Sequence, residues 1–275
     1  MNRIFTIMAI VASLGLFAQE GPKISSAIIQ LNNNRDLAGA KEYIDEATVV
    51  IRNKSASEVR EKDMSKYLYY NGLIHLRIAN NKDPEIQKLD SNALDIAAES
   101  FKKLLAFEEK TGKERFTEET REQLPYVANM YAQRGIGKAS AGAHMAAYKD
   151  FLITYELKKE LGMGTDTSMY YNAALMAQNA GELEKSLTIY EALIEMDYRG
   201  LIYKGTSVES GEVVEFPSRK ALNRMVQQKK VKDPVVEGDL RPIFMSNAAN
   251  LYLATGDTTQ YDAMVAEGRK MFPEK

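Results

Sequence analysis

The sequence predicts an all-α protein built from about five helical hairpins. Ala, Leu, Glu and Lys, which favour helices, are abundant, whereas 17 Gly and 7 Pro in 275 residues are few for an all-β protein. A second observation is that small residues recur at matching offsets along the chain. A third is that glycines follow these runs, because a helix often ends at a residue with the left-handed backbone that Gly adopts readily.

The first 18 residues, MNRIFTIMAIVASLGLFA, have the layout of a secretory signal peptide. Arg3 precedes an apolar run from Ile4 to Phe17, and small Ala18 precedes the expected cleavage before Gln19. The alternative is a membrane anchor, but the run is shorter than the roughly 20 residues that a spanning helix needs. We therefore expect an exported protein, periplasmic rather than secreted, with no stable membrane anchor after signal cleavage.

Composition excludes several classes of function. The chain has no cysteine, so disulfides, thiol-ligated metals and a lipid anchor on an N-terminal Cys are all excluded. Without Arg3 the mature form has 35 basic and 38 acidic residues, a net charge of −3 that does not suit nucleic acid. The basic cluster at residues 229–232 is interpreted as a solvated segment. We expect no cofactor and no metal.

The hairpin pattern is clearest in two C-terminal stretches. Gly181 comes eleven positions after Tyr170, and Gly256 comes eleven positions after Met245. The small residues between these ends are Ala173, Ala174, Ala177, Ala248 and Ala249. Small side chains let two antiparallel helices approach closely, and larger residues one turn away fill the groove beside the contact. Each stretch is therefore predicted to be the first helix of a hairpin.

Three earlier hairpins follow the same logic, and together the five cover most of residues 22–273. They are marked by Ala27, Ile28, Ala40, Ile44 and Ala47; by Leu68, Gly72, His75, Ala97, Phe101 and Leu104; and by Ala128, Tyr131, Gly135, Ala147, Phe151 and Tyr155. Equivalent small residues are 44 to 75 positions apart. An undecorated array of such hairpins repeats every 34 or so residues. Insertions therefore separate them.

These offsets resemble the tetratricopeptide repeat (TPR), whose pattern is a large residue, a small pair, an aromatic, later Ala and Phe, and a closing Pro. With its signal peptide and insertions, the chain resembles exported TPR proteins of the Bacteroidota periplasmic type. The resemblance covers nearly all of residues 22–275. It implies a TPR-like α-solenoid that acts as a binding or assembly scaffold and is not an enzyme.

The largest insertion, residues 200–240, is predicted to contain a β-hairpin and a short helix. Strands at residues 206–208 and 213–216 flank a turn, and Ser218 caps a helix through Met225. The sequence given ends at Lys275, just after the Pro that would lead into another helix. We therefore expect further repeats or a partner chain to cover the C-terminal hairpin.

Motifs that resemble catalytic sites are weak here. Ser100–Lys103 and Lys110–Gly112 match two motifs of penicillin-recognising serine enzymes, but Lys110 comes only seven positions after Lys103, and the second motif belongs on a distant strand. Residues 134–139 lack the Ser or Thr of a phosphate loop. His75 is expected to pack between helices. Glu108 and neighbouring carboxylates near helix ends are interpreted as solvated.

A peptide or protein segment is the expected ligand, bound on the concave face formed by the first helix of each hairpin. Inward positions read from the spacing give a Tyr and Asn surface: Tyr69, Tyr70, Tyr126, Asn129, Tyr171, Asn172, Asn247 and Asn250. Tyr supplies contact area and Asn pairs with backbone groups. Lys66 and Arg77 are the main cations there, too few for a clamp on acidic tails. The alternative is a small-molecule or glycan receptor with residues 200–240 as a lid.

Overall fold

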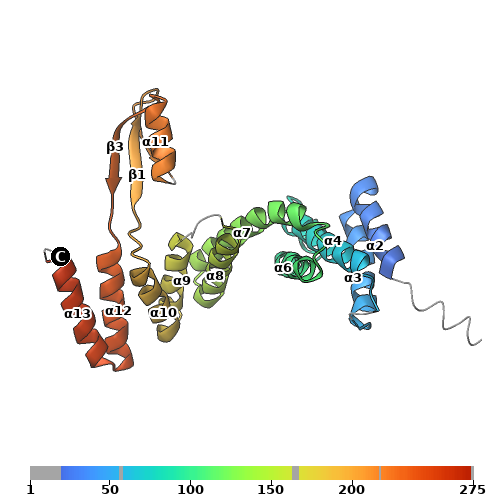
Figure 1. The fold of residues 1–275 in the computed structure, drawn as a ribbon, viewed down its shortest axis with the longest axis horizontal. Coiled ribbons are helices and arrows are strands. Elements are labelled where there is room, and N and C mark those ends of the chain that lie inside the picture. Colours follow the sequence, from blue (N-terminus) through green and yellow to red (C-terminus); the bar gives the residue numbers. More distant parts are fainter. Residues whose placement is uncertain (1–19, 56–57, 163–166, 217, 274–275) are drawn as a thin grey trace, which may run out of the picture. The chain divides into compact units, whose positions relative to one another are not determined.

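Figure 1 shows the computed structural model of the chain, which describes residues 20–55, 58–162, 167–216 and 218–273. The predicted all-α, TPR-like fold of helical hairpins is confirmed, and a small antiparallel sheet is inserted between two of the helices. The expected signal peptide lies outside the described residues. The chain divides after Tyr131 into two compact units, and each is described by itself.

The first unit contains two helical hairpins. Helices α2 and α3 pack against each other, α4 packs against α6, and α3 also contacts α4. The bounds are α2 (Glu20–Ile29), a π-helical turn (Gln30–Asn34), α3 (Leu37–Arg52), α4 (Glu61–Ala79), α5 (Pro84–Gln87) and α6 (Ala93–Thr111). Helix α7 (Thr117–Ser140) begins in this unit and continues into the second. The first two predicted hairpins are therefore present.

Glycine allows the helices of two hairpins to approach closely. A Cβ atom added at Gly72 of α4 would lie 2.5 Å from Cε1 of Phe101 on α6. In the second unit, a Cβ atom at Gly135 of α7 would lie 2.8 Å from Cε1 of Phe151 on the next helix, α8 (His144–Glu160). Carbon atoms in contact normally stay about 3.5–4.0 Å apart, so no side chain fits at either position without displacing a buried ring.

Glu108 corrects one interpretation of the sequence, because its side chain is buried rather than solvated. Its Oε2 accepts hydrogen bonds from the N–H groups of Arg115 (2.8 Å) and Phe116 (3.1 Å) and from Oγ1 of Thr117 (2.8 Å). Burial alone raises the pKa of Glu108, but the hydrogen bonds, including one from Ser65, outweigh it and lower the pKa. The carboxylate thus caps the start of α7, where the helix dipole favours negative charge.

The second unit holds the remaining hairpins. Its core joins α8, α9, α10 and α12 through Phe151, Tyr190 and Phe244, with Ala173, Ala174 and Ala248 among the small residues between them. The bounds are α8 (His144–Glu160), α9 (Thr167–Asn179), α10 (Leu183–Glu195), α12 (Arg241–Thr255) and α13 (Thr258–Met271). Gly181 and Gly256 follow α9 and α12 with φ of +78° and +86°. Both glycines are therefore in the predicted left-handed conformation.

The insertion is larger than the predicted β-hairpin, because a third strand joins it. Strands β1 (Ile202–Ser207), β2 (Val213–Phe216) and β3 (Val231–Glu237) form an antiparallel sheet in the order β2-β1-β3, with α11 (Arg219–Gln227) before β3. The cluster at residues 229–232 was interpreted as a solvated segment. Its lysines are exposed, but Val231 is buried and begins β3. This strand could not be predicted from the sequence, because Asp233 and Pro234 interrupt the alternation of apolar and polar residues.

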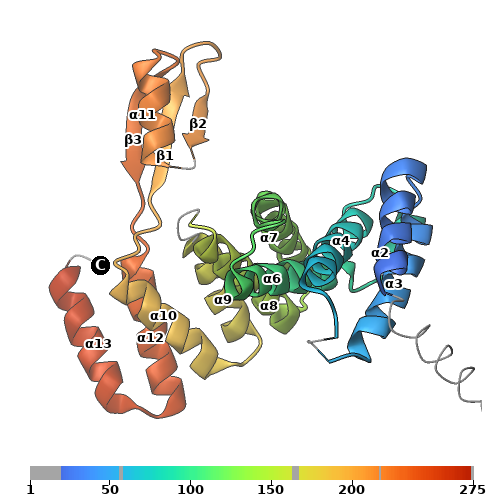
Figure 2. The same cartoon turned by 45° about the vertical axis from the view of Figure 1, so that its right-hand side comes forward.

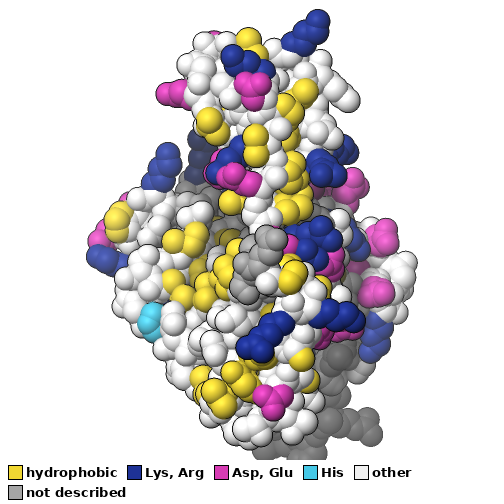
Figure 3. All heavy atoms as spheres, turned by 90° about the vertical axis from the view of Figure 1, so that its left-hand side faces the viewer, with side chains coloured by type: hydrophobic (Ala, Val, Ile, Leu, Met, Phe, Trp, Pro, Cys, Tyr) yellow, Lys and Arg dark blue, Asp and Glu magenta, His cyan; other side chains and the backbone are white. Residues whose placement is uncertain are grey.

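One face of the small sheet is covered and the other is open. Helix α11 packs across the strands, and Leu222 lies beside Gly205 and Val231 with 1% of its side chain exposed. Figure 2 shows the insert projecting from the helices of its own unit, and Figure 3 shows hydrophobic side chains along it. Val208 and Val213 of the insert are exposed.

The last hairpin, α12 and α13, has an open groove between its two helices. None of the residues of α13 is buried, and a groove of about 310 Å³ runs between α12 and α13. Met245, Ala249, Tyr261 and Met264 line this groove. That another chain or further repeats cover it stays a prediction.

Candidate functional site

The eight residues predicted to bind a peptide fall into two sets of four, one in each unit. In the first unit, Tyr69 of α4 stacks on Phe116, with ring centroids 4.7 Å apart and planes 9° apart. Tyr70 meets Tyr69 edge to face at 5.1 Å and Phe116 at 6.1 Å. Burial raises the pKa of Tyr69. These two tyrosines are thus held by aromatic packing.

Tyr69 and Tyr126 line one open groove of about 780 Å³ in the first unit. Tyr126, on α7, is 63% exposed. Leu73 and Leu76 of α4 form an apolar floor, and the other lining residues are Leu37, Arg77, Asn80, Asn81, Lys82 and Gln123. Asn129 is exposed on α7 but does not line this groove. The structure therefore brings two of the four predicted residues together.

The groove has two cations at its rim. Arg77, in the last turn of α4, was recognised in the sequence, whereas Lys82 was not. Lys82 lies in the loop after α4, where helical spacing gives no guide to side-chain position. Both side chains are exposed, and in the described part of the chain neither forms an ion pair. The sequence signal that could have identified Lys82 is its position directly after Asn80 and Asn81 at the end of α4.

In the second unit, the predicted residues mostly contact the protein itself. Tyr171 packs on Phe244 at 5.1 Å and on Tyr190 at 6.3 Å between ring centroids. The side-chain amide of Asn247 donates a hydrogen bond of 2.9 Å to the Tyr190 hydroxyl. Asn172 is half-buried, and Asn250 lines the groove between α12 and α13. Peptide binding by this set stays a prediction.

The residues of the catalytic-like motifs have structural contacts. Ser100 is buried and accepts a hydrogen bond of 2.7 Å from the Asn71 amide. His75 is buried between α4 and its neighbours, as predicted, and its Nδ1 lies 2.8 Å from the carbonyl oxygen of Asn71. Among the described residues, no group of three or more His, Asp or Glu side chains is arranged to hold a metal ion.

Among the residues that the structure describes, no helix combines the length and the apolar character needed to cross a bilayer.

Comparisons with known proteins give structural likeness only. No family model matches the chain. No curated protein matches it. Similar solved structures include BtubC (BKLC) from P. vanneervenii, with a TM-score of 0.34 and 12% identity over 92% of this chain and 88% of that one. A putative kinesin light chain with TPR-like repeats from Podospora anserina gives 0.33 and 11% over 90% and 92%.

PilF of Pseudomonas aeruginosa has a TM-score of 0.29 and 10% identity, over 95% of both chains. Scores this low carry no weight for function, which has to rest on this chain's own side chains. Those side chains define a class: an all-α, helical-hairpin repeat protein with open grooves between its helices.

Proposed function

We propose that this protein is a non-catalytic interaction scaffold that binds a peptide segment of a partner protein in the Tyr69–Tyr126 groove. The observation that carries the proposal is the composition of that groove. It combines an apolar floor, an exposed tyrosine, amides and two cations that form no ion pair with any described residue, within about 780 Å³. Tyr and Asn side chains suit adaptable recognition of a backbone, and Arg pairs with carboxylates.

The two rim cations favour a segment that carries at least one acidic residue. Arg77 and Lys82 leave a positive rim around an apolar floor, so a carboxylate next to an apolar side chain matches both features. A glycan receptor closed by residues 200–240 is the weaker candidate. The tyrosine that such a lid would cover, Tyr171, is already engaged by Phe244 and Tyr190.

Export to the periplasm is part of the same proposal and rests on the sequence of residues 1–18. Cell fractionation combined with N-terminal sequencing tests it. We expect the mature chain in the periplasmic fraction, beginning at Gln19. The scaffold is further proposed to serve envelope assembly. An intact N-terminus in the cytoplasmic or membrane fraction would refute both export and this role.

Site-specific photo-crosslinking tests the groove. A photoreactive amino acid replaces Tyr126, and in a control chain it replaces Lys110, which is exposed on α6 and does not line the groove. We expect protein crosslinks from position 126 and few from position 110. Arg77→Glu combined with Lys82→Glu should remove them without changing helical circular dichroism. Equal crosslinking from both positions, or crosslinks that survive the charge reversal, would contradict the site.

A further inference from the structure

The groove between α12 and α13 repeats a surface that this chain already covers with one of its own helices. The hairpins α9–α10 and α12–α13 share one register: Gly256 comes 75 positions after Gly181, and α13 begins 75 positions after α10. The face of the α9–α10 hairpin is covered by α12. The described residues leave the corresponding groove of the α12–α13 hairpin, about 310 Å³, open.

The contacts of α12 show what kind of element such a face binds. Phe244 of α12 packs against Tyr171 of α9 and Tyr190 of α10, with ring centroids 5.1 and 6.1 Å apart. Ala248 and Leu251, one and two turns further along α12, are buried in the same core. Residues with this spacing lie on one face of a helix. The covering element is therefore an amphipathic helix whose apolar face begins with an aromatic ring.

The residues that hold α12 have counterparts in the open groove. The residues 75 positions after Tyr171, Ala174, Tyr190 and Leu193 are, in this order, Ser246, Ala249, Val265 and Gly268, and all four line the groove. Three of the four are smaller than their counterparts. Because the stabilisation from apolar contact grows with the area removed from water, a helix that fills this groove needs a large apolar side chain.

The charge at the end of the second helix differs between the two hairpins. After α10, Oδ1 of Asp197 lies 2.7 Å from Nη1 of Arg241, in the first turn of α12. In the last hairpin Phe272 is the counterpart of Asp197, and Arg269, one turn earlier, lines the groove. Arg269 is exposed and forms no ion pair with any residue that the structure describes. An acidic residue in the first turn of an incoming helix would pair with Arg269, and the helix dipole also favours it there.

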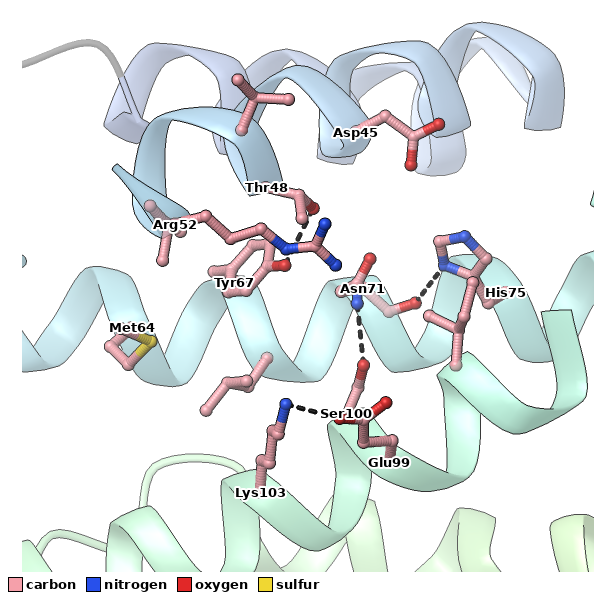
Figure 4. Close-up of a pocket in the computed structure, with 14 residues that line it drawn as sticks. Asp45, Thr48, Arg52, Met64, Tyr67, Asn71, His75, Glu99, Ser100 and Lys103 are labelled. Carbon is pink, nitrogen blue, oxygen red and sulfur yellow. Dashed lines mark hydrogen bonds and ion pairs between the residues drawn. The ribbon is translucent and has the colours of Figure 1, made fainter. Parts of the chain in front are cut away.

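The cavity of the first unit is different, because most of its polar groups bond one another. Figure 4 shows this cavity, which holds about 460 Å³ between α3, α4 and α6. Asn71 donates to Ser100 at 2.7 Å, and Lys103 pairs with Glu99 at 2.6 Å. Arg52 lines the cavity from α3. These bonded groups connect α4 to α6 and one turn of α6 to the next, so they stabilise the hairpins themselves.

We propose that the α12–α13 groove binds an amphipathic helix of a partner protein. The helix packs on this hairpin as α12 packs on the preceding one. A large apolar side chain of the helix contacts Ala249 and Val265, and an acidic residue in its first turn pairs with Arg269. A second copy of the chain cannot supply its own α12, because that helix is already buried against α10. The surface is separate from the Tyr69–Tyr126 groove, since it belongs to the second unit.

Fluorescence anisotropy with labelled helical peptides and the full-length chain tests the proposal. The probe is the 15-residue sequence of α12 with Arg241→Glu. A hydrocarbon staple on its polar side keeps it helical, because isolated helices of this length are marginal in water. The matched peptides are the unchanged α12 sequence and the probe with Phe244→Ala.

We expect the probe to bind, because it combines the aromatic ring with an acidic first turn. The unchanged sequence should bind about fivefold more weakly, and the Phe244→Ala peptide at least about tenfold more weakly. No binding up to about 1 mM probe, or equal affinity for the Phe244→Ala peptide, would overturn the proposal. Sedimentation of the chain alone tests the other occupant, since a dimer that the probe dissociates would identify a second copy and refute the partner helix.

Two variants with the same charge change locate the binding. Arg269→Glu should weaken binding of the probe by about fivefold and should instead favour the peptide that retains Arg241. Lys270→Glu changes the neighbouring exposed cation, which does not line the groove, and should change each affinity less than about twofold. Circular dichroism verifies that both variants fold. Equal effects of the two substitutions would refute the pairing with Arg269.

Discussion

Gly72→Ala tests the physical basis of the fold, the close approach of α4 and α6. Alanine is the better helix former by about 1 kcal/mol, so helix propensity alone predicts stabilisation. The new Cβ, however, would lie 2.5, 2.7 and 3.0 Å from three ring atoms of Phe101, which is fully buried. Overpacking of this kind costs about 1–3 kcal/mol. We expect net destabilisation of about 1 kcal/mol, which corresponds to a lower Tm by about 2–4 °C.

Gly137→Ala is the matched control. Gly137 is also inside a helix, α7, but a Cβ atom there meets nothing within 4 Å. Gly137→Ala should therefore stabilise the protein by most of the difference in helix propensity between Gly and Ala, about 1 kcal/mol. Urea unfolding followed by circular dichroism measures both variants, whose free energies of unfolding should differ by the clash, about 1–3 kcal/mol. Equal stabilisation by the two substitutions would refute the close-approach argument.

Three further predictions concern other parts of the molecule. The pKa of Glu108 is lowered, so its contribution to the free energy of unfolding should be full above its ordinary pKa of 4.5 and lost as pH falls through the lower pKa of the folded state. Glu108→Gln should therefore reduce the loss of stability at acidic pH, as measured by urea unfolding. Burial raises the pKa of Tyr190 to about 12, despite the hydrogen bond from Asn247. Its contribution to the free energy of unfolding should therefore persist below pH 10 and be lost as pH rises through about 12. In an absorbance titration, Tyr190→Phe should remove one tyrosine that ionises at unusually high pH. Leu222→Ala should destabilise the insert by about 2–5 kcal/mol, seen as faster hydrogen exchange in β1 and β3 but not in α9; equal acceleration in both would contradict it.

The hairpins could be predicted because their pattern is local. Small residues at fixed offsets, with a glycine after the helix, specify a helix face and its end, and Gly72 and Gly181 occupy those positions in the structure. Strand β3 could not be predicted in the same way. Its alternation is interrupted by Asp233, with φ of +50°, and by Pro234, and its pairing with β1 depends on residues about 30 positions away.

The candidate sites were only partly predictable from sequence. Helical spacing identified Tyr69 and Tyr126, but it could not identify Lys82, which a loop brings to the same groove. It also could not show that the amide of Asn247 is already bonded to Tyr190. Spacing gives the direction in which a side chain leaves its helix, and the neighbouring elements determine whether that side chain remains free.

The sequence by itself determined that this chain forms paired helices, where those helices end and that thiol chemistry is absent, because these properties depend on composition and on residues within a few turns. Only the tertiary structure decided which polar groups are used internally and which line a cavity. Glu108 is buried as a helix cap, whereas Arg52 forms no ion pair with the residues that the structure describes, although both are charged residues near helix ends. Their difference comes from what other segments bring to them, a long-range property that no local pattern encodes.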